Sequence, residues 1–169
     1  MTINTKTLAA IDIGTNAIRL FISNVEEYPT ETLFKKIAFL RVPIRLGEDV
    51  FTTGEIGQQK RKRLCETMQG FSYIMSAFNV ESYKAYATCA MREARNGKSV
   101  AEQIQKECDL NIEIISGTKE AETIFAGGMN EVVDDDKTYL YVDVGGGSTE
   151  VIVYSKSVKV EACSFPLGT

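Results

Sequence analysis

LAAIDIGTN, residues Leu8–Asn16, is repeated in pattern near the other end of the chain by LYVDVGGGS, residues Leu140–Ser148. In each stretch an apolar strand runs into an aspartate, an apolar residue and a glycine, and a second apolar strand follows a small polar loop. A duplicated unit of this kind predicts two similar lobes, each of which presents one glycine turn to a shared cleft.

The residue types in these turns are suited to binding phosphate. Glycine allows a tight turn and a close approach of the ligand, and successive backbone N–H groups form an anion-binding concavity. The hydroxyls of Thr15 and Ser148 can add donors, while Asp12 and Asp143 can hold Mg²⁺ or a metal-bound water. An Asp-x-Gly sequence can also be an ordinary turn, and a Gly-rich run a flexible one. The duplication favours phosphate binding over that alternative.

The hydrophobic pattern predicts an α/β fold with a mixed sheet and the element order βββαβαβα. After the first strand we expect strands at 17–25, 33–46, 82–87 and 112–115, a loop at 47–53, and helices at 57–78, 99–108 and 117–128. Leu64, Met68, Phe71, Met75 and Phe78 recur at helical spacing and predict one buried stripe. A charged run at 133–137 predicts a boundary between a first lobe, residues 1–130, and the start of a second, residues 137–169.

Composition narrows the possible chemistry. Apolar residues make up 44% and charged residues 25%, as in globular proteins, and the net charge of −4 provides no basic field for a nucleic acid polymer. No apolar run is long enough for a membrane span, and the N-terminus lacks the apolar core of a signal peptide. The absence of histidine excludes Ser-His-Asp triads and HExxH zinc sites, so a general base must be another residue type. The 4 widely spaced cysteines argue against a zinc cluster and fit a reducing cytoplasm, where we expect them to be buried thiols.

Four ordered motifs give the chain a family resemblance. They are DIGTN at Asp12–Asn16, ATCAMREA at Ala87–Ala94, IISGTKEA at Ile114–Ala121 and VDVGGGSTE at Val142–Glu150. In this the chain resembles the exopolyphosphatase / guanosine pentaphosphate phosphatase (Ppx/GppA) family. The resemblance implies the superfold of actin, Hsp70 and sugar kinases, with one ribonuclease-H-like lobe and the opening strands of a second. Members of this bacterial family are longer, so we expect residues 1–169 alone to be inactive and any homodimer to form through C-terminal domains.

The resemblance also implies roles for individual residues. Glu120 corresponds to the catalytic base, and Asp143 and Glu150 to carboxylates that bind metal or position water, with Asp12 as a further metal candidate. The expected phosphate contacts are Asn16, Arg92, Gly145, Gly146, Gly147 and Ser148, with Thr15 and Arg19 as additional candidates. Without histidine, a carboxylate at the start of a helix facing the cleft is also the best base on chemical grounds.

Each of these roles has a simpler alternative. Glu120 could complement a helix N-terminus, and Asp143 could be an ordinary turn residue. Glu150 could be an exposed strand residue, and Arg92 and Arg19 could be surface charges. We expect Glu122 to point elsewhere on its helix, into solvent.

The resemblance implies a cytoplasmic hydrolase that uses carboxylate-activated water and Mg²⁺ to release terminal phosphate. Its substrate would be inorganic polyphosphate, guanosine pentaphosphate or both, without a membrane partner. An ATP-dependent kinase of the same superfold and a non-hydrolysing phosphate- or nucleotide-binding module are the alternatives. The Ser-Gly-x-x-Glu-Ala sequence argues against the kinase, and the presence of Glu120, Asp143 and Glu150 together argues against a module that only binds.

Overall fold

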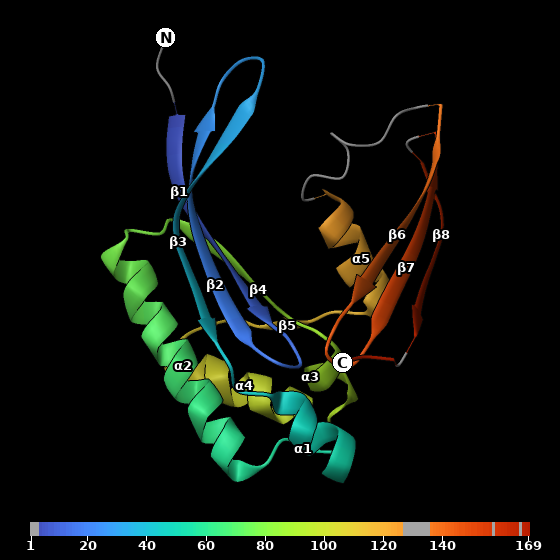
Figure 1. The fold of residues 1–169 in the computed structure, drawn as a ribbon. Coiled ribbons are helices and arrows are strands. Elements are labelled where there is room, and N and C mark those ends of the chain that lie inside the picture. Colours follow the sequence, from blue (N-terminus) through green and yellow to red (C-terminus); the bar gives the residue numbers. More distant parts are fainter. Residues whose placement is uncertain (1–3, 127–135, 157, 166) are drawn as a thin grey trace.

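The computed structural model describes residues 4–126, 136–156, 158–165 and 167–169. Two sheets stand opposite one another, and helices line the outer side and the base of the first sheet (Figure 1). The strands of the first sheet are β1 (Asn4–Ile13), β2 (Ile18–Glu27), β3 (Thr32–Val42), β4 (Ser82–Ala87) and β5 (Glu113–Ile114). The second sheet contains β6 (Thr138–Val144), β7 (Thr149–Ser155) and β8 (Val158–Phe165). The helices are α1 (Leu46–Thr53), α2 (Gln58–Ala77), α3 (Cys89–Glu93), α4 (Gly97–Cys108) and α5 (Gly117–Ala126).

The first sheet has the mixed topology that the sequence predicts. Its strand order is β3-β2-β1-β4-β5, with antiparallel pairing of β1, β2 and β3 and parallel pairing of β4 with β1 and β5. The parallel pairs require crossovers, and α2 and α4 supply helices for them. The first half of the chain therefore forms an α/β layer with one meander and two crossover units.

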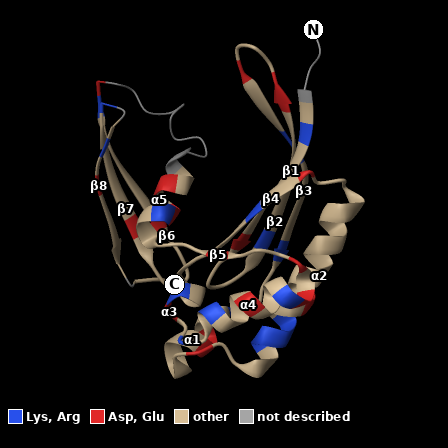
Figure 2. Cartoon of the chain, turned by 180° about the vertical axis from the view of Figure 1, so that it is seen from behind, with Lys and Arg blue, Asp and Glu red and all other residues tan. Residues whose placement is uncertain are grey.

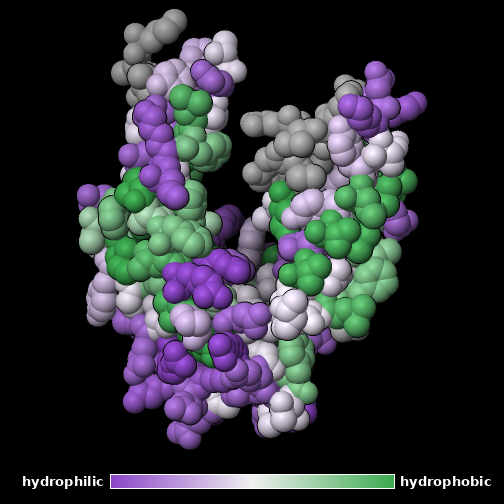
Figure 3. Space-filling view, in the orientation of Figure 1, coloured by the Kyte–Doolittle hydropathy of each residue, from purple (hydrophilic) through white to green (hydrophobic). Residues whose placement is uncertain are grey.

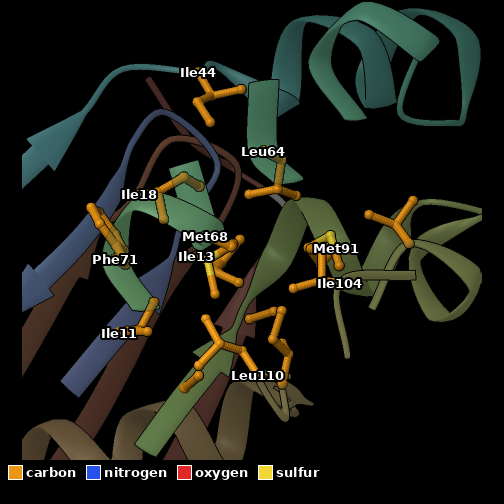
Figure 4. Packing of buried hydrophobic residues seen from close by; sticks show 14 of the residues in the cluster. Ile11, Ile13, Ile18, Ile44, Leu64, Met68, Phe71, Met91, Ile104 and Leu110 are labelled. Carbon is orange, nitrogen blue, oxygen red and sulfur yellow. The ribbon is translucent and has the colours of Figure 1, made fainter. Parts of the chain in front are cut away.

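The main core lies between this sheet and α2 and α4 (Figure 4). Ile11, Ile13 and Ile18 come from the sheet, and they pack with Leu64 and Met68 of α2. The stripe expected on α2 is confirmed through Met75, whereas Phe78 is 42% exposed. Phe78 follows the last residue of α2, where the chain leaves the helix and turns toward β4.

Two short helices depart from the prediction. Residues 46–53, which we expected to extend a strand and form a loop, are instead α1, because Pro43 cannot donate to the ladder and β3 ends at Val42. The backbone N–H of Gly47 donates to the Thr15 carbonyl at 3.1 Å, which fastens α1 to the first glycine turn. The unpredicted α3 follows β4 directly and carries Arg92.

Helix α5 packs against the second sheet. Ala121 is buried together with Ile152 and Tyr154 of β7, and Lys159 of β8 forms an ion pair of 2.7 Å with Glu122. The expected helix end at Gly128, and residues 133–135 of the charged connector, lie outside the described residues. The position of the domain boundary stays a prediction, but α5 is a structural partner of β7 and β8 although it precedes them in the chain.

None of the helices in the described part of the chain is both long and apolar enough to cross a membrane. The 20-residue α2 is the longest, and it begins with a run of charged residues at 60–63.

Candidate active site between the two glycine turns

The two duplicated segments form equivalent hairpins. In the first, the Gly14 N–H donates to the Ala17 carbonyl at 3.2 Å, and in the second, the Gly145 N–H donates to the Ser148 carbonyl at 2.8 Å. The register is equivalent as well, since Asp12 pairs with Arg19 and Asp143 with Glu150. The internal repeat read from the sequence is therefore a repeat in three dimensions.

The turns face and touch each other. A Cβ on Gly146 would lie 2.4 Å from the side-chain nitrogen of Asn16, and one on Gly147 would lie 2.4 Å from the ring of Phe51 on α1. An alanine at either position would have to displace the Asn16 or Phe51 side chain of the first lobe. The phosphate-binding candidates Asn16, Gly146 and Gly147 are thus brought together from segments about 130 residues apart in sequence.

A cleft of about 730 Å³ lies beside this contact. Figure 3 shows the molecule hollowed between the two lobes, with hydrophilic residues at the base of the hollow. Its lining includes nine of the predicted site residues: Asp12, Thr15, Asn16, Arg19, Glu120, Asp143, Gly145, Gly146 and Ser148. A second cavity of about 750 Å³ lies on the other side of the turns and is lined by Arg92, Gly146, Gly147 and Ser148.

Glu120 lies in the first turn of α5, where the sequence predicts it. The Ser116 hydroxyl accepts a hydrogen bond from the Lys119 N–H at 3.1 Å, so Ser116 caps the start of the helix. Glu120 is four-fifths buried, with 18% of its side chain exposed. Burial, and then the nearby Glu150 carboxylate, raise the pKa of Glu120 to about 7, against the opposing effect of Arg92. The carboxyl group can therefore exchange a proton near neutral pH.

Arg92 of α3 sits beside this carboxylate. Its Nη1 atom lies 3.5 Å from Oε2 of Glu120, longer than an ordinary hydrogen bond, and donates to the Ile115 carbonyl at 3.0 Å. Oε2 of Glu120 is buried and accepts no hydrogen bond from the residues that the structure describes. A water molecule would satisfy this acceptor.

Two further carboxylates lie near Glu120 on the second hairpin, of which Asp143 lines the cleft and Glu150 does not. Glu150 is only 2% exposed, and its Oε1 accepts a hydrogen bond of 3.0 Å from the Ser164 hydroxyl, so the alternative of an exposed strand residue is wrong. Burial and the neighbouring Glu150 raise the pKa of Asp143 above its usual range, while Arg19 acts in the opposite direction. Glu150 is thus close enough to both Glu120 and Asp143 for its charge to raise the pKa of each.

The carboxylates fit a divalent cation held only partly by protein. Among the described ranges, no three His, Cys, Asp or Glu side chains lie close enough together to enclose an ion. Magnesium, however, usually takes one or two carboxylates and completes its shell with water and substrate phosphate. Burial first, and then the negative charge of Glu150, raise the pKa of Asp143, and a bound cation would offset the second of these effects. Asp12 is less available, because Arg19 forms an ion pair of 2.5 Å with it.

The last described residues, 167–169, return to the second turn. Thr169 N–H donates to the Gly145 carbonyl at 3.1 Å, and the Thr149 hydroxyl donates to the Leu167 carbonyl at 2.7 Å. The sequence analysis did not predict the contact of Thr169 with the second turn. It also did not predict Phe51, which lines the cavity beside Arg92. Thr169 and Phe51 both lie outside the recognisable motifs.

Known proteins resemble the chain in sequence. A profile of the Ppx/GppA phosphatase family matches residues 11–169. A bifunctional 3-dehydroquinate synthase/phosphatase from Fusobacterium nucleatum is 34% identical over 84% of this chain and 22% of its own length. A putative exopolyphosphatase from Haemophilus influenzae is 28% identical over 89% of this chain and 45% of its own length. The chain thus spans less than half the length of these curated relatives.

Solved structures of exopolyphosphatases and Ppx/GppA proteins also resemble the chain. An exopolyphosphatase from Cytophaga hutchinsonii superimposes with a TM-score of 0.85 at 29% identity, covering 96% of this chain and 51% of that one. A Ppx/GppA family member from Aquifex aeolicus gives 0.82 at 26% identity, covering 98% and 52%. The ethanolamine utilization protein EutJ from Carboxydothermus hydrogenoformans, at 13% identity and a TM-score of 0.52, shares the fold alone.

Proposed function

The chain belongs to the Ppx/GppA phosphatase family, and we propose that it forms half of the active site of a hydrolase that releases the terminal phosphate of a phosphoanhydride chain. The observation that carries the proposal is the meeting of two glycine turns beside a buried carboxylate whose pKa is about 7. The substrate is inorganic polyphosphate, guanosine pentaphosphate or both. Family membership favours transfer of the phosphoryl group to water over transfer to a sugar.

The turns bind and align the substrate. Backbone N–H groups around Gly146 and Gly147, with the Asn16 amide opposite them, hold neighbouring phosphoryl groups. Arg92 offers a planar guanidinium from the adjoining cavity, which suits phosphate oxygens. In-line alignment and charge neutralisation provide most of the catalysis in phosphoryl transfer.

Glu120 takes the proton of the attacking water. The water oxygen forms a bond to the terminal phosphorus as the anhydride P–O bond breaks, and the shortened chain leaves with the bridging oxygen. The proton that the water loses goes to the Glu120 carboxylate. Because the pKa of Glu120 is about 7, a large fraction of the Glu120 side chains is ionised at neutral pH. Asp12 and Asp143 lie in the same cleft, on opposite hairpins.

Asp143 and Glu150 would hold Mg²⁺, with Asp12 on the opposite hairpin as a weaker candidate because of its ion pair with Arg19. When bound, the ion would neutralise the phosphate oxygens. The two residues pair on adjacent strands, with Asp143 lining the cleft and Glu150 buried next to it.

Phosphate release by the full-length protein tests the proposal. We expect release from long-chain polyphosphate or guanosine pentaphosphate with Mg²⁺, and loss of release when EDTA removes the metal. A sugar acceptor should not increase ATP consumption. Transfer of phosphate to a sugar, or tight binding of both substrates with no release under any metal condition, would contradict a hydrolase.

A further inference from the structure

Arg41 has no role in the phosphate clamp described above, yet it faces the same cleft. It lies on β3 directly opposite Arg19 of β2 in the antiparallel register. Directly opposed residues share one face of a sheet, and like charges in this position destabilise it. A negative partner would therefore stabilise two arginines that lie side by side.

The protein supplies that partner for only one of them. Asp12 lies opposite Arg19 on the next strand and forms an ion pair with it at 2.5 Å. Within the described part of the chain, Arg41 has no carboxylate partner. The row across three strands thus reads Asp12, Arg19, Arg41, and it leaves one cation without a counter-ion.

Arg41 also stands where two cavities meet. It lines the cleft that contains Asp12, Glu120 and Gly145, and it lines a separate cavity of about 460 Å³ next to α1. Asn16 of the first turn lines both as well. A ligand that extends from the turns past Asn16 would therefore come to Arg41 on its way toward α1.

The charged residues that line the smaller cavity are Arg41, Arg45 and Glu48, and Glu48 is paired with Arg45, which leaves the charge of Arg41 available to a ligand. Arg45 lines the smaller cavity and forms an ion pair of 3.3 Å with Glu48. The Arg45 N–H donates to the Asn16 carbonyl at 3.0 Å, and this hydrogen bond holds the first turn beside Arg45. Figure 2 shows basic and acidic segments along the strands of the first sheet. Because one exposed cation would be well solvated, a single phosphate would gain little here, but a tethered chain of phosphates arrives at high effective concentration.

We propose that Arg41 is a specificity-determining residue that binds a phosphoryl group of a linear polyphosphate beyond those held by the two turns. The inference rests on the proposed function, since it takes the turns as the site of the reacting phosphate. Arg41 touches only the distant part of the chain, so it favours long substrates and leaves the chemical step unchanged.

The test compares Arg41→Gln with wild type in the full-length protein, using tripolyphosphate and long-chain polyphosphate. We expect KM for the long chain to rise about tenfold, as for loss of one charge-assisted contact, with kcat unchanged and KM for tripolyphosphate altered less than twofold. Arg41→Lys should recover part of the affinity. Lys36→Gln, an exposed cation of the same strand that lines neither cavity, is the matched control and should behave as wild type.

Binding measured without turnover separates this inference from the proposed function. Calorimetric titration of long-chain polyphosphate into wild type and Arg41→Gln should show weaker binding to the variant whether or not the protein hydrolyses it. Hydrolysis by wild type with equal affinities for both proteins would overturn the role of Arg41 alone. Equal loss for tripolyphosphate and the long chain would also overturn it, because Arg41 would then belong to the reacting subsite.

Discussion

Asn16 lies directly against Gly146, so that a Cβ on this glycine would come within 2.4 Å of the asparagine side-chain nitrogen. The contact joins the first hairpin to the second at the point where a chain of phosphates would pass. It makes the two turns parts of one site.

Gly146→Ala should therefore impair the enzyme more than the fold. The new methyl group must push Asn16 away from its position, and the turns would separate slightly. We expect kcat/KM for phosphate release to fall at least tenfold, because misplacement of a phosphate by a fraction of an ångström is costly in phosphoryl transfer. The unfolding temperature, followed by circular dichroism, should change little.

Gly70→Ala is the control for this substitution. Gly70 lies within α2 with open space around it, and alanine is favoured over glycine there by about 1 kcal/mol. The variant should keep full activity and unfold at a slightly higher temperature. Equal activity of Gly146→Ala and wild type would show that the contact with Asn16 has no part in the reaction.

The pH dependence of the rate should report Glu120 and its neighbour Arg92. The base must be ionised, so kcat/KM should rise with pH and reach half its maximum near pH 7. Arg92 lowers the pKa of Glu120, and its removal in Arg92→Gln should shift the midpoint to higher pH in addition to weakening substrate binding. Arg95→Gln, which removes an exposed arginine paired with Glu55, should leave the midpoint in place.

The stability of the protein should depend on Glu120 in a predictable direction. Its pKa is raised in the folded state, from 4.5 to about 7, so folding is favoured by protonation. This contribution is fully present below pH 4.5 and is lost as the pH rises through 7. At pH 8, the free energy of unfolding of Glu120→Gln should therefore exceed that of wild type by up to about 3 kcal/mol. Urea unfolding at pH 4 and pH 8 measures this, and a difference that is larger at pH 4 would contradict it.

The core between α2 and the first sheet should determine global stability. Leu64 is fully buried there, and Leu64→Ala should lower the free energy of unfolding by about 2–5 kcal/mol through lost burial and a residual cavity. Tyr73 on the same helix is 69% exposed, and Tyr73→Ala should cost less than 1 kcal/mol. Denaturant titration of both variants measures this difference. Similar losses in the free energy of unfolding would contradict a core between α2 and the first sheet.

Most of the first lobe could be predicted because its elements carry strong local patterns. The alternation of Ile18, Leu20 and Ile22 specifies a half-buried strand, and all three side chains are buried in the structure. The apolar stripe of α2 likewise specifies its inner face. These signals are periodic over enough residues to be read without knowledge of the tertiary structure.

The missed helices have weaker signals. Helix α1 is eight residues long and contains Gly47, Thr52 and Thr53, which are poor helix formers. Its bond to the Thr15 carbonyl and the burial of Val50 stabilise it from outside the segment. Tertiary contacts of this kind have no counterpart in a local pattern.

The sequence predicted most residues that line the candidate site, but it predicted their spatial arrangement only in part. The repeat indicated that the two turns would meet, and the contact of Asn16 with Gly146 confirms it. Burial of Glu150 could not be read from the strand, because a glutamate there is ordinarily exposed until α5 and Ser164 enclose it. Arg41 carries no motif and becomes visible only when the strand register places it beside Arg19.

The most direct test of the account compares Glu120→Gln with Glu122→Gln in the full-length protein. Glu122 lies on the same helix, is exposed and pairs only at the surface with Lys159, so its loss should not affect the reaction. We expect kcat for phosphate release from polyphosphate to fall by about 10²–10⁴-fold in Glu120→Gln and to stay within twofold of wild type in Glu122→Gln. Equal rates for Glu120→Gln and wild type would contradict the central claim that this carboxylate activates the attacking water.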